Sequence, residues 1–188
     1  MKISLLGLVA VLGFASASVR GGETFAVDPV HSSVLFGIKH LGVTNFYAVF
    51  EDISGTVTFD KEDPSKSSFE LTVPVESLDS RNPKRDQHLK SPDFFNVEQF
   101  PTLSFKSTKV EANGDVYQVT GDFTLHGVTK SITVEFTRGP DGKNMEGGVI
   151  GGGETRFTIK RSDYGMNFMQ GALGDEVHII LSIEAGKQ

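Results

Sequence analysis

Residues 117–137, YQVTGDFTLHGVTKSITVEFT, decide the fold class. Apolar side chains alternate with polar ones over residues 117–125 and again over 132–136, on either side of His126-Gly127. Strict alternation is typical of an antiparallel strand with one buried face and one face in water. The His-Gly pair between the two runs is typical of a tight turn. The stretch therefore predicts a β-hairpin.

The same alternation recurs along the chain. It is strong at 68–75 and 177–184, weaker at 31–40, 46–60, 101–111 and 154–161, and brief at 24–28. Asn113-Gly114 supplies a second hairpin turn, and residues 139–142 open a longer hairpin. About eight strands in a meander predict an all-β sandwich or closed barrel.

Helix is scarce in this sequence. The best candidate is 82–91, where Asn82 suits the N-cap and Pro83 the first helical position. A second short turn is expected near 40–44. The fold class is therefore all-β with one or two short helices.

The N-terminus has the pattern of a secretory signal peptide. Lys2 is followed by an apolar run of roughly 12 residues, which is too short for a membrane span of about 20. Small residues at Ala15 and Ala17 suit a signal peptidase, so cleavage is expected after Ala17. Residues 1–17 are then the signal peptide, and 18–188 form a single domain. No later segment is apolar enough to cross a bilayer. The signal peptide therefore leads us to expect a protein that is exported, to the periplasm or as a secreted protein.

Charge and cysteine content exclude several classes of function. The net charge is −6, which argues against nucleic acid as a partner because phosphate binding needs a cationic surface. The chain has no cysteine, so disulfides and thiolate catalysis are excluded. The 15 Phe, 3 Tyr and absence of Trp suit a dry interior, since Phe needs no hydrogen-bond partner.

The expected inward faces of the strands carry almost no polar atoms. An eight-stranded barrel of this kind is either filled by side chains or wide enough for one slim ligand. Apolar walls would favour an alkyl or isoprenyl chain, at about 0.8 kcal/mol for each buried CH₂. Periodicity alone leaves the filled core and the ligand tunnel equally open.

Four stretches in order resemble the YceI-like family of exported polyisoprenoid-binding proteins. They are FAVDPVHSSVLF with IKHL (25–36 and 38–41), DQHLKSPDFFN with FPTLSFKS (86–96 and 100–107), GDFTLHGVTK (121–130) and RSDYGM (161–166). The resemblance spans residues 25 to about 185. It implies an extended eight-stranded antiparallel lipocalin-like β-barrel that holds a long polyisoprenoid lipid, such as an isoprenoid quinone or an isoprenyl phosphate. A homodimer is plausible by resemblance alone.

On this reading the lipid tail meets the inward apolar side chains of the barrel. The predicted tail contacts are Phe36, Phe50, Phe59, Leu71, Val73, Phe105, Phe123, Leu125 and Phe157. The predicted head contacts are Arg81, Asp86, His88 and Tyr164. The first three belong to the densest basic cluster of an acidic chain. A phosphate head would pair with Arg81 or Arg85. The alternative is a capping network that fixes the 82–91 helix.

Other chemistry has little support in the sequence. His31 is expected to bond to backbone at a strand start, and Arg161 to pair with Asp163. No two histidines have metal-ligand spacing, and Gly-x-Ser-x-Gly is absent. We therefore expect no metal, no catalytic residue and no cofactor apart from the bound lipid.

Two other functions stay open at this point. One is an interaction protein with a filled barrel, acting through Ile180 and the aromatic stretch 94–100 on its outer surface. The other is an enzyme that acts on an isoprenoid, which would need a polar group of shifted pKa deep in the tunnel.

Overall fold

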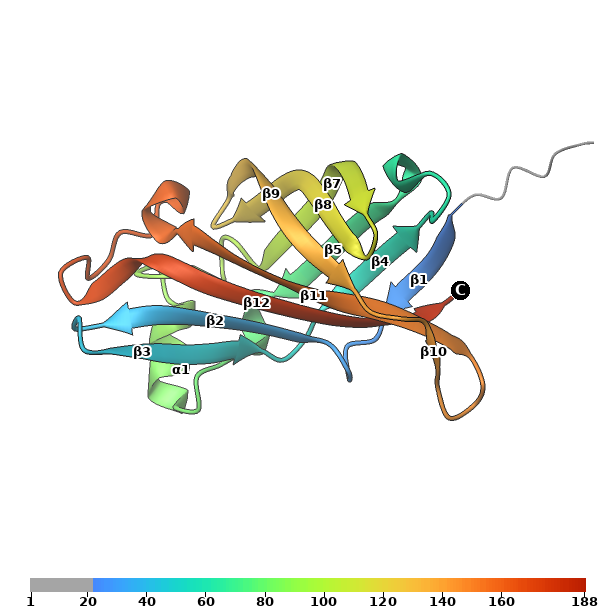
Figure 1. Ribbon diagram of the computed structural model, residues 1–188. Coiled ribbons are helices and arrows are strands. Elements are labelled where there is room, and N and C mark those ends of the chain that lie inside the picture. Colours follow the sequence, from blue (N-terminus) through green and yellow to red (C-terminus); the bar gives the residue numbers. More distant parts are fainter. Residues whose placement is uncertain (1–21) are drawn as a thin grey trace, which may run out of the picture.

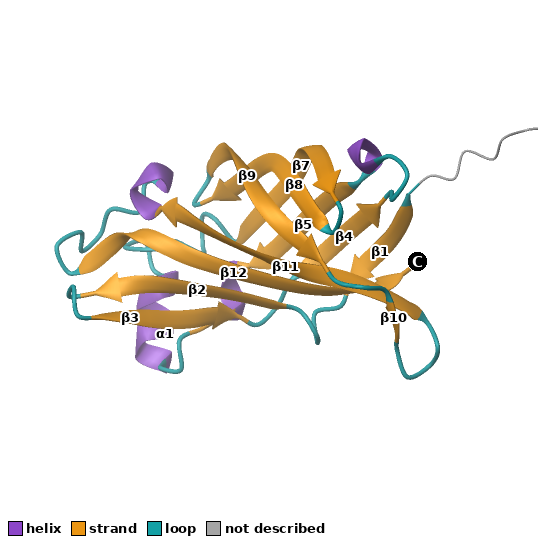
Figure 2. Cartoon of the chain, in the orientation of Figure 1, coloured by secondary structure: helices purple, strands orange, loops and turns teal. Residues whose placement is uncertain are grey.

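The computed structural model describes residues 22–188, and strands dominate it (Figures 1 and 2). The predicted signal peptide, residues 1–17, lies outside the described residues. The barrel strands are β1 (Glu23–Val27), β4 (Ser54–Phe59), β5 (Ser68–Pro74), β7 (Thr102–Asn113), β8 (Val116–Leu125), β9 (Val128–Arg138), β11 (Val149–Lys160) and β12 (Leu173–Lys187). Each is antiparallel to its neighbour, and pairing of β11 with both β9 and β12 closes the ring. The closed eight-stranded barrel confirms the predicted fold class.

Three further strands extend the wall beyond the ring. They are β2 (Ser33–His40), β3 (Thr44–Phe50) and β6 (Leu78–Asp79). The long strand β12 pairs with β2 along its first part and with β1 near its end. The β2–β3 hairpin therefore prolongs the barrel wall at one end (Figure 1).

The remaining elements are short. β10 (Gly142–Lys143) pairs with the start of β11, and η1 (Pro64–Lys66), η2 (Val75–Ser77) and η3 (Arg161–Tyr164) are single 3₁₀ turns. The α-helix α1 (Pro83–Lys90) begins as predicted, with the Asn82 side chain accepting a hydrogen bond from the Arg85 N–H. No helix within residues 22–188 has the length and hydropathy needed to span a bilayer.

One predicted strand is divided in the structure. Residues 46–60 form β3 and β4 rather than one strand, because residues 51–53 carry the chain from the β2–β3 extension to the barrel wall. The buried side chain of Ile53 fixes this crossing.

The ring closes through a short ladder between β9 and β11. These strands pair only from Gly153 to Thr155 within the described chain, opposite Arg138 to Phe136. A Cβ atom on Gly153 would lie 2.2 Å from the Thr137 carbonyl oxygen, and one on Gly152 would lie 1.9 Å from that of Ile183. The two glycines therefore permit β11 to lie close to both β9 and β12. We call the short ladder between β9 and β11 the seam.

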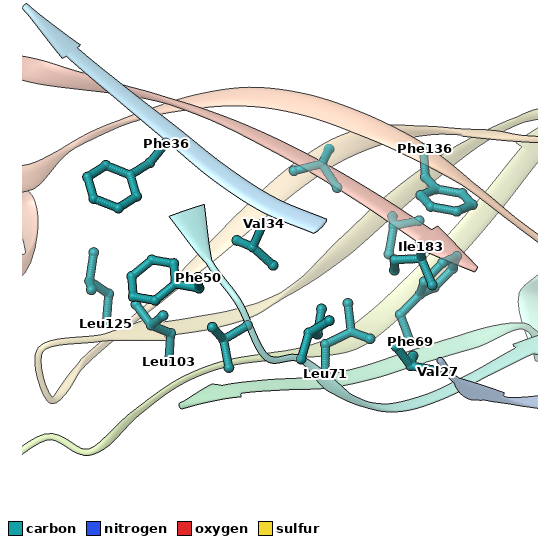
Figure 3. Packing of buried hydrophobic residues seen from close by; sticks show 14 of the residues in the cluster. Val27, Val34, Phe36, Phe50, Phe69, Leu71, Leu103, Leu125, Phe136 and Ile183 are labelled. Atoms are coloured by element: carbon teal, nitrogen blue, oxygen red, sulfur yellow. The ribbon is translucent and has the colours of Figure 1, made fainter. Parts of the chain in front are cut away.

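One end of the barrel is filled by aromatic side chains. The ring of Phe59 lies 5.8 Å from Phe25, 5.7 Å from Phe69 and 5.7 Å from Tyr117, and Phe69 lies 5.1 Å from Phe136. Figure 3 shows Phe69 and Phe136 on one side of the interior, with Phe36 and Phe50 on the other. The ligand space must therefore lie toward the β2–β3 end.

Candidate functional site

A cavity of about 450 Å³ occupies the interior between the aromatic end and the β2–β3 hairpin. Its walls come from β2, β3, β5, β7, β8, β9, β11 and β12, together with α1 and the segment before β12. The exposed residues among its lining mark the mouth: His40, Thr44, Asn45, Arg85, His88 and Met169. The mouth therefore lies between the β2–β3 turn, α1 and the 165–172 segment.

The lining is almost wholly apolar because the strands alternate as the sequence predicts. Phe36, Phe50 and Phe95 form one wall, with ring centroids 5.5–6.0 Å apart. Phe123 and Phe157, 6.2 Å apart, belong to another. Such walls can hold a hydrocarbon chain by excluding water.

Eight of the nine predicted tail residues line this cavity. They are Phe36, Phe50, Leu71, Val73, Phe105, Phe123, Leu125 and Phe157. Phe59 does not line it. Its side chain points inward as predicted, but it is enclosed by the aromatic cluster at the filled end. Alternation predicts the face of a strand, whereas depth along the barrel follows from the packing of distant strands.

The predicted head residues are dispersed. Only His88 lines the cavity, where its Nε2 bonds to Asp93 Oδ2 at 2.9 Å and its ring contacts Phe94 and Phe168. Arg81 is exposed, and its backbone N–H donates to Asp79 Oδ1. Asp86 accepts hydrogen bonds from the backbone and hydroxyl of the buried Ser80. Asp86 thus belongs to the capping network that was the alternative for this cluster.

Tyr164 lies behind the cavity wall instead of at the mouth. Its ring is buried, 5.6 Å from Phe123, and Lys130 Nζ lies 5.9 Å from its centroid. Burial raises the pKa of the Tyr164 hydroxyl, and the nearby Asp163 carboxylate adds to this. Because β9 and β11 pair only at the seam, we infer that Tyr164 helps to fill the wall beyond it.

Arg85 is the cation at the mouth. Its Nε donates to Ser80 Oγ at 2.9 Å and its Nη2 to the Ser80 carbonyl at 2.6 Å. Its Cζ lies 4.3 Å above the ring of Phe46. Within residues 22–188, Arg85 makes no salt bridge, and no carboxylate lines the cavity. Arg85 therefore offers the mouth one guanidinium without an acidic partner in the described chain, although the chain is acidic overall.

Arg161 is a second lining cation, and its partners differ from the predicted Asp163. The buried guanidinium donates to the carbonyls of Met166, Phe168, Leu173 and Gly174. Asp163 instead lies 3.7 Å from Lys130 Nζ. Burial lowers the pKa of Arg161, while Asp175 opposes this shift. The salt-bridge prediction was wrong because the Arg161 side chain turns inward to satisfy a loop.

Thr155 is a lining residue that sequence reasoning missed. Its hydroxyl is buried and has no hydrogen-bond partner in the described chain. A threonine in the inward register of β11, between Phe157 and Gly153, was the available signal. This hydroxyl could bond to a polar atom of a bound ligand.

His31 lies outside the cavity, and its partner is a carboxylate rather than backbone. Its Nδ1 is 2.8 Å from Asp28 Oδ2 and 3.6 Å from Glu184 Oε1. The hydrogen bond to Asp28 raises the pKa of His31 above its usual range. The three side chains are close enough to bind a metal ion, but they already pair with one another.

The aromatic stretch 94–100 does not form the expected outer surface. Phe94 and Phe95 are buried and line the cavity. Phe100 packs against His126 at 4.6 Å. The prediction was wrong because backbone hydrogen bonds from residues 94–97 to 89–91 fold this stretch back against the mouth.

Comparisons with known proteins agree with this architecture. The YceI-like domain family model matches residues 25–185. A UPF0312 protein of Pseudomonas aeruginosa is 38% identical over 186 residues, covering 96% of this chain and 97% of the relative. Protein YceI of Escherichia coli O157:H7 is 38% identical over 194 aligned positions, covering 100% of each chain.

Two solved structures share the fold. Burkholderia cenocepacia BcnA aligns with a TM-score of 0.77 at 25% identity, covering 85% of this chain and 99% of BcnA. A polyisoprenoid binding domain from Saccharophagus degradans aligns with a TM-score of 0.68 at 12% identity, covering 87% and 98%. At that identity the second likeness concerns the fold alone.

Proposed function

The chain belongs to the YceI-like domain family, and on that premise we propose that it is a lipid-binding protein that holds a polyisoprenoid in its barrel cavity. The observation that carries the proposal is the cavity of about 450 Å³, whose walls are almost wholly apolar and whose mouth bears Arg85 and His88. Burying an isoprenyl chain there would gain about 0.8 kcal/mol for each CH₂ removed from water.

The proposed ligand is an isoprenoid quinone or an isoprenyl phosphate. Its tail would lie between the Phe36–Phe50 wall and the Phe123–Phe157 wall, with its head at the mouth. The protein would be exported to the periplasm and would transport, store or sense the lipid there, as a monomer or as a homodimer. Solvent exclusion is the mechanism, because the cavity shields a water-insoluble tail.

Binding without catalysis is part of the proposal. The guanidinium of Arg161 is already bonded to four carbonyls, and the Asp86 carboxylate accepts hydrogen bonds from Ser80 and does not line the cavity. The sequence-based condition for an enzyme was a polar group of shifted pKa deep in the tunnel. Arg161 is buried and its pKa is shifted, but its hydrogen bonds to backbone carbonyls give it a structural role. Turnover of an isoprenoid that depended on His88 or Thr155 would contradict the proposal.

Native mass spectrometry of the protein purified from its host without detergent tests the proposal. We expect a stoichiometric extra mass that extracts into organic solvent as an isoprenoid. Phe123→Asp should abolish this retention, because it places a charge on the cavity wall. Thr124→Asp is the matched control, since Thr124 is the next residue and its hydroxyl faces the strand exterior, bonded to Thr129.

Two outcomes would contradict the proposed function. One is a bare polypeptide mass that stays bare after incubation with isoprenoid quinones and isoprenyl phosphates. The other is a folded Phe123→Asp protein that keeps its lipid as well as Thr124→Asp does.

A further inference from the structure

Four exposed apolar side chains surround the cavity mouth. Leu41 and Val43 lie in the β2–β3 turn with 61% and 82% of their surface exposed, and Phe168 and Met169 lie in the segment before β12 with 40% and 44% exposed. We call these four residues the mouth rim. Exposed apolar groups that gather at one place mark an interaction surface more often than isolated ones do.

The two loops of the mouth rim are joined to each other and to the cavity. The Leu41 N–H donates to the Ala172 carbonyl at 2.7 Å, and His40 pairs with Leu173 across β2 and β12. Met169 is itself a lining residue, and Phe168 contacts the lining residues His88 and Phe94. The apolar surface of the mouth rim thus continues into the apolar cavity wall.

The backbone at the mouth rim adopts a costly conformation. Leu41 and Met169 have φ angles of 50° and 54°, in the left-handed region that bulky side chains rarely adopt. The N–H groups of Ala172 and Leu173 both donate to the Met169 carbonyl and fix that turn. Such strain tends to occur at functional segments.

Charge at this end of the molecule favours a lipid surface. His40, Arg85 and His88 line the mouth, and no carboxylate among residues 22–188 lines the cavity, although Asp93 bonds to His88 at its edge. Apolar side chains beside a cation such as Arg85 are a combination by which proteins rest on a membrane surface that contains anionic lipids.

We propose that the mouth rim docks on the surface of a phospholipid bilayer, so that an apolar ligand passes between membrane and cavity without crossing water. This inference rests on the proposed function for its purpose. The continuity of the mouth rim with the cavity identifies the occupant: a lipid that enters through this mouth must leave a lipid phase directly in front of it.

Vesicle flotation tests the docking surface. The full protein would be mixed with phosphatidylcholine vesicles and with mixed phosphatidylcholine–phosphatidylglycerol vesicles. The Val43→Asp, Phe168→Asp double variant should lose roughly tenfold or more in vesicle affinity, because both apolar side chains leave the interface. Wild-type protein should bind the mixed vesicles more tightly, because Arg85 can meet the phosphate of an anionic lipid at the mouth.

The chain offers close controls for this experiment. Val30 is 82% exposed, as is Val43, but it precedes β2 instead of following it. Met145 is fully exposed in the turn between β10 and β11. Val30→Asp with Met145→Asp adds the same charge away from the mouth and should leave vesicle binding unchanged. Circular dichroism would verify that both double variants fold.

Two results would overturn the proposal. The first is equal vesicle binding by the two double variants. The second is a homodimer in native mass spectrometry that the mouth-rim substitutions dissociate, because a second copy would then be the occupant. The same spectra separate this inference from the proposed function: a wild-type protein that carries an isoprenoid but ignores vesicles refutes docking alone. A bare protein whose vesicle binding needs the mouth rim refutes the polyisoprenoid ligand alone.

Discussion

Arg85 and Arg161 are two cations on the same cavity, and their hydrogen bonds give them different roles. Arg161 is buried and bonded to four backbone carbonyls, so it organises the segment before β12. Arg85 is exposed, is held by Ser80 and Phe46, and has no acidic partner in the described chain. A fixed guanidinium with no acidic partner is suited to a phosphate oxygen.

Replacing Arg85 should therefore alter the choice of head group. We expect Arg85→Gln to weaken binding of an isoprenyl phosphate by roughly tenfold or more, since a charge-assisted hydrogen bond contributes about 1.5–3 kcal/mol. Binding of an isoprenoid quinone of the same chain length should change little. Titration of each lipid by native mass spectrometry measures both affinities.

Lys84→Gln is the control for this change, because Lys84 lies on the same helix and does not line the cavity. An equal loss of phosphate binding in both variants would indicate general electrostatics instead of a contact by Arg85.

The tail residues could be predicted from the sequence and the head residues could not. Alternation along β8 or β11 determines which side chains point inward, because each strand has only two faces. The residues around the cavity mouth lie in loops and a helix, where no such alternation predicts the direction of a side chain. Arg81 and Arg85 are four residues apart in one basic cluster, and the cap at Asn82 sends the first into solvent and the second over Phe46.

The short element η3 and the loop that follows it form one side of the mouth. Arg161 begins η3, and its guanidinium reaches across to carbonyls between Met166 and Gly174. Ser162 is tied to the Asp175 carboxylate through both its backbone N–H and its hydroxyl, and these bonds lower the pKa of Asp175. The rim residues Phe168 and Met169 are thus carried by a loop that is fastened at both ends.

Removing the guanidinium should loosen this element. Arg161→Met leaves several buried carbonyls unpaired, and we expect it to lower the free energy of unfolding by roughly 3 kcal/mol. Urea denaturation measures the change. Arg156→Met removes an exposed arginine of β11 whose one ion pair within residues 22–188 is with Glu154, and it should cost less than about 0.5 kcal/mol. Equal losses in the two variants would contradict a structural role for Arg161.

Most elements could be predicted where local chemistry determines them. Asn113-Gly114 and His126-Gly127 form the turns of their hairpins, and Asn82-Pro83 begins the helix. The division of residues 46–60 into two strands escaped prediction, because β3 pairs with β2 and β6 whereas β4 pairs with β1 and β5. Partners chosen from distant parts of the chain leave no local pattern.

The whole molecule is a tube with one filled end and one open end. The aromatic cluster around Phe59 and the Arg138 guanidinium, 4.6 Å above the Phe59 ring, fill the end away from the mouth. Periodicity could not separate a filled barrel from a tunnel, because inward Phe residues serve both. The barrel is filled by side chains at one end and encloses the cavity at the other.

A blind cavity should select ligands by length. We expect the affinity for isoprenyl phosphates to rise by roughly tenfold or more with each added five-carbon unit, since about 0.8 kcal/mol accompanies each buried CH₂. The rise should stop once the chain reaches the Phe69–Phe136 pair. Titration with a series of chain lengths measures this dependence. Affinity that did not vary with length would mean that the tail lies outside the barrel.

Short ladders in the barrel wall, such as the seam between β9 and β11, limit the width of the ligand that the barrel can hold. A barrel wall widens only by breaking backbone hydrogen bonds. Two ladders of the described ring are the shortest, with three residue pairs each: Gly153–Thr155 with Arg138–Phe136, and Phe25–Val27 with Lys187–Ala185. A slim, flexible isoprenyl chain fits without widening the barrel. A rigid fused-ring sterol, although equally apolar, would force the wall apart at one of these short ladders and break its hydrogen bonds. The short ladders thus limit the width of a ligand that the barrel can hold, in addition to any selection of the head group at the mouth.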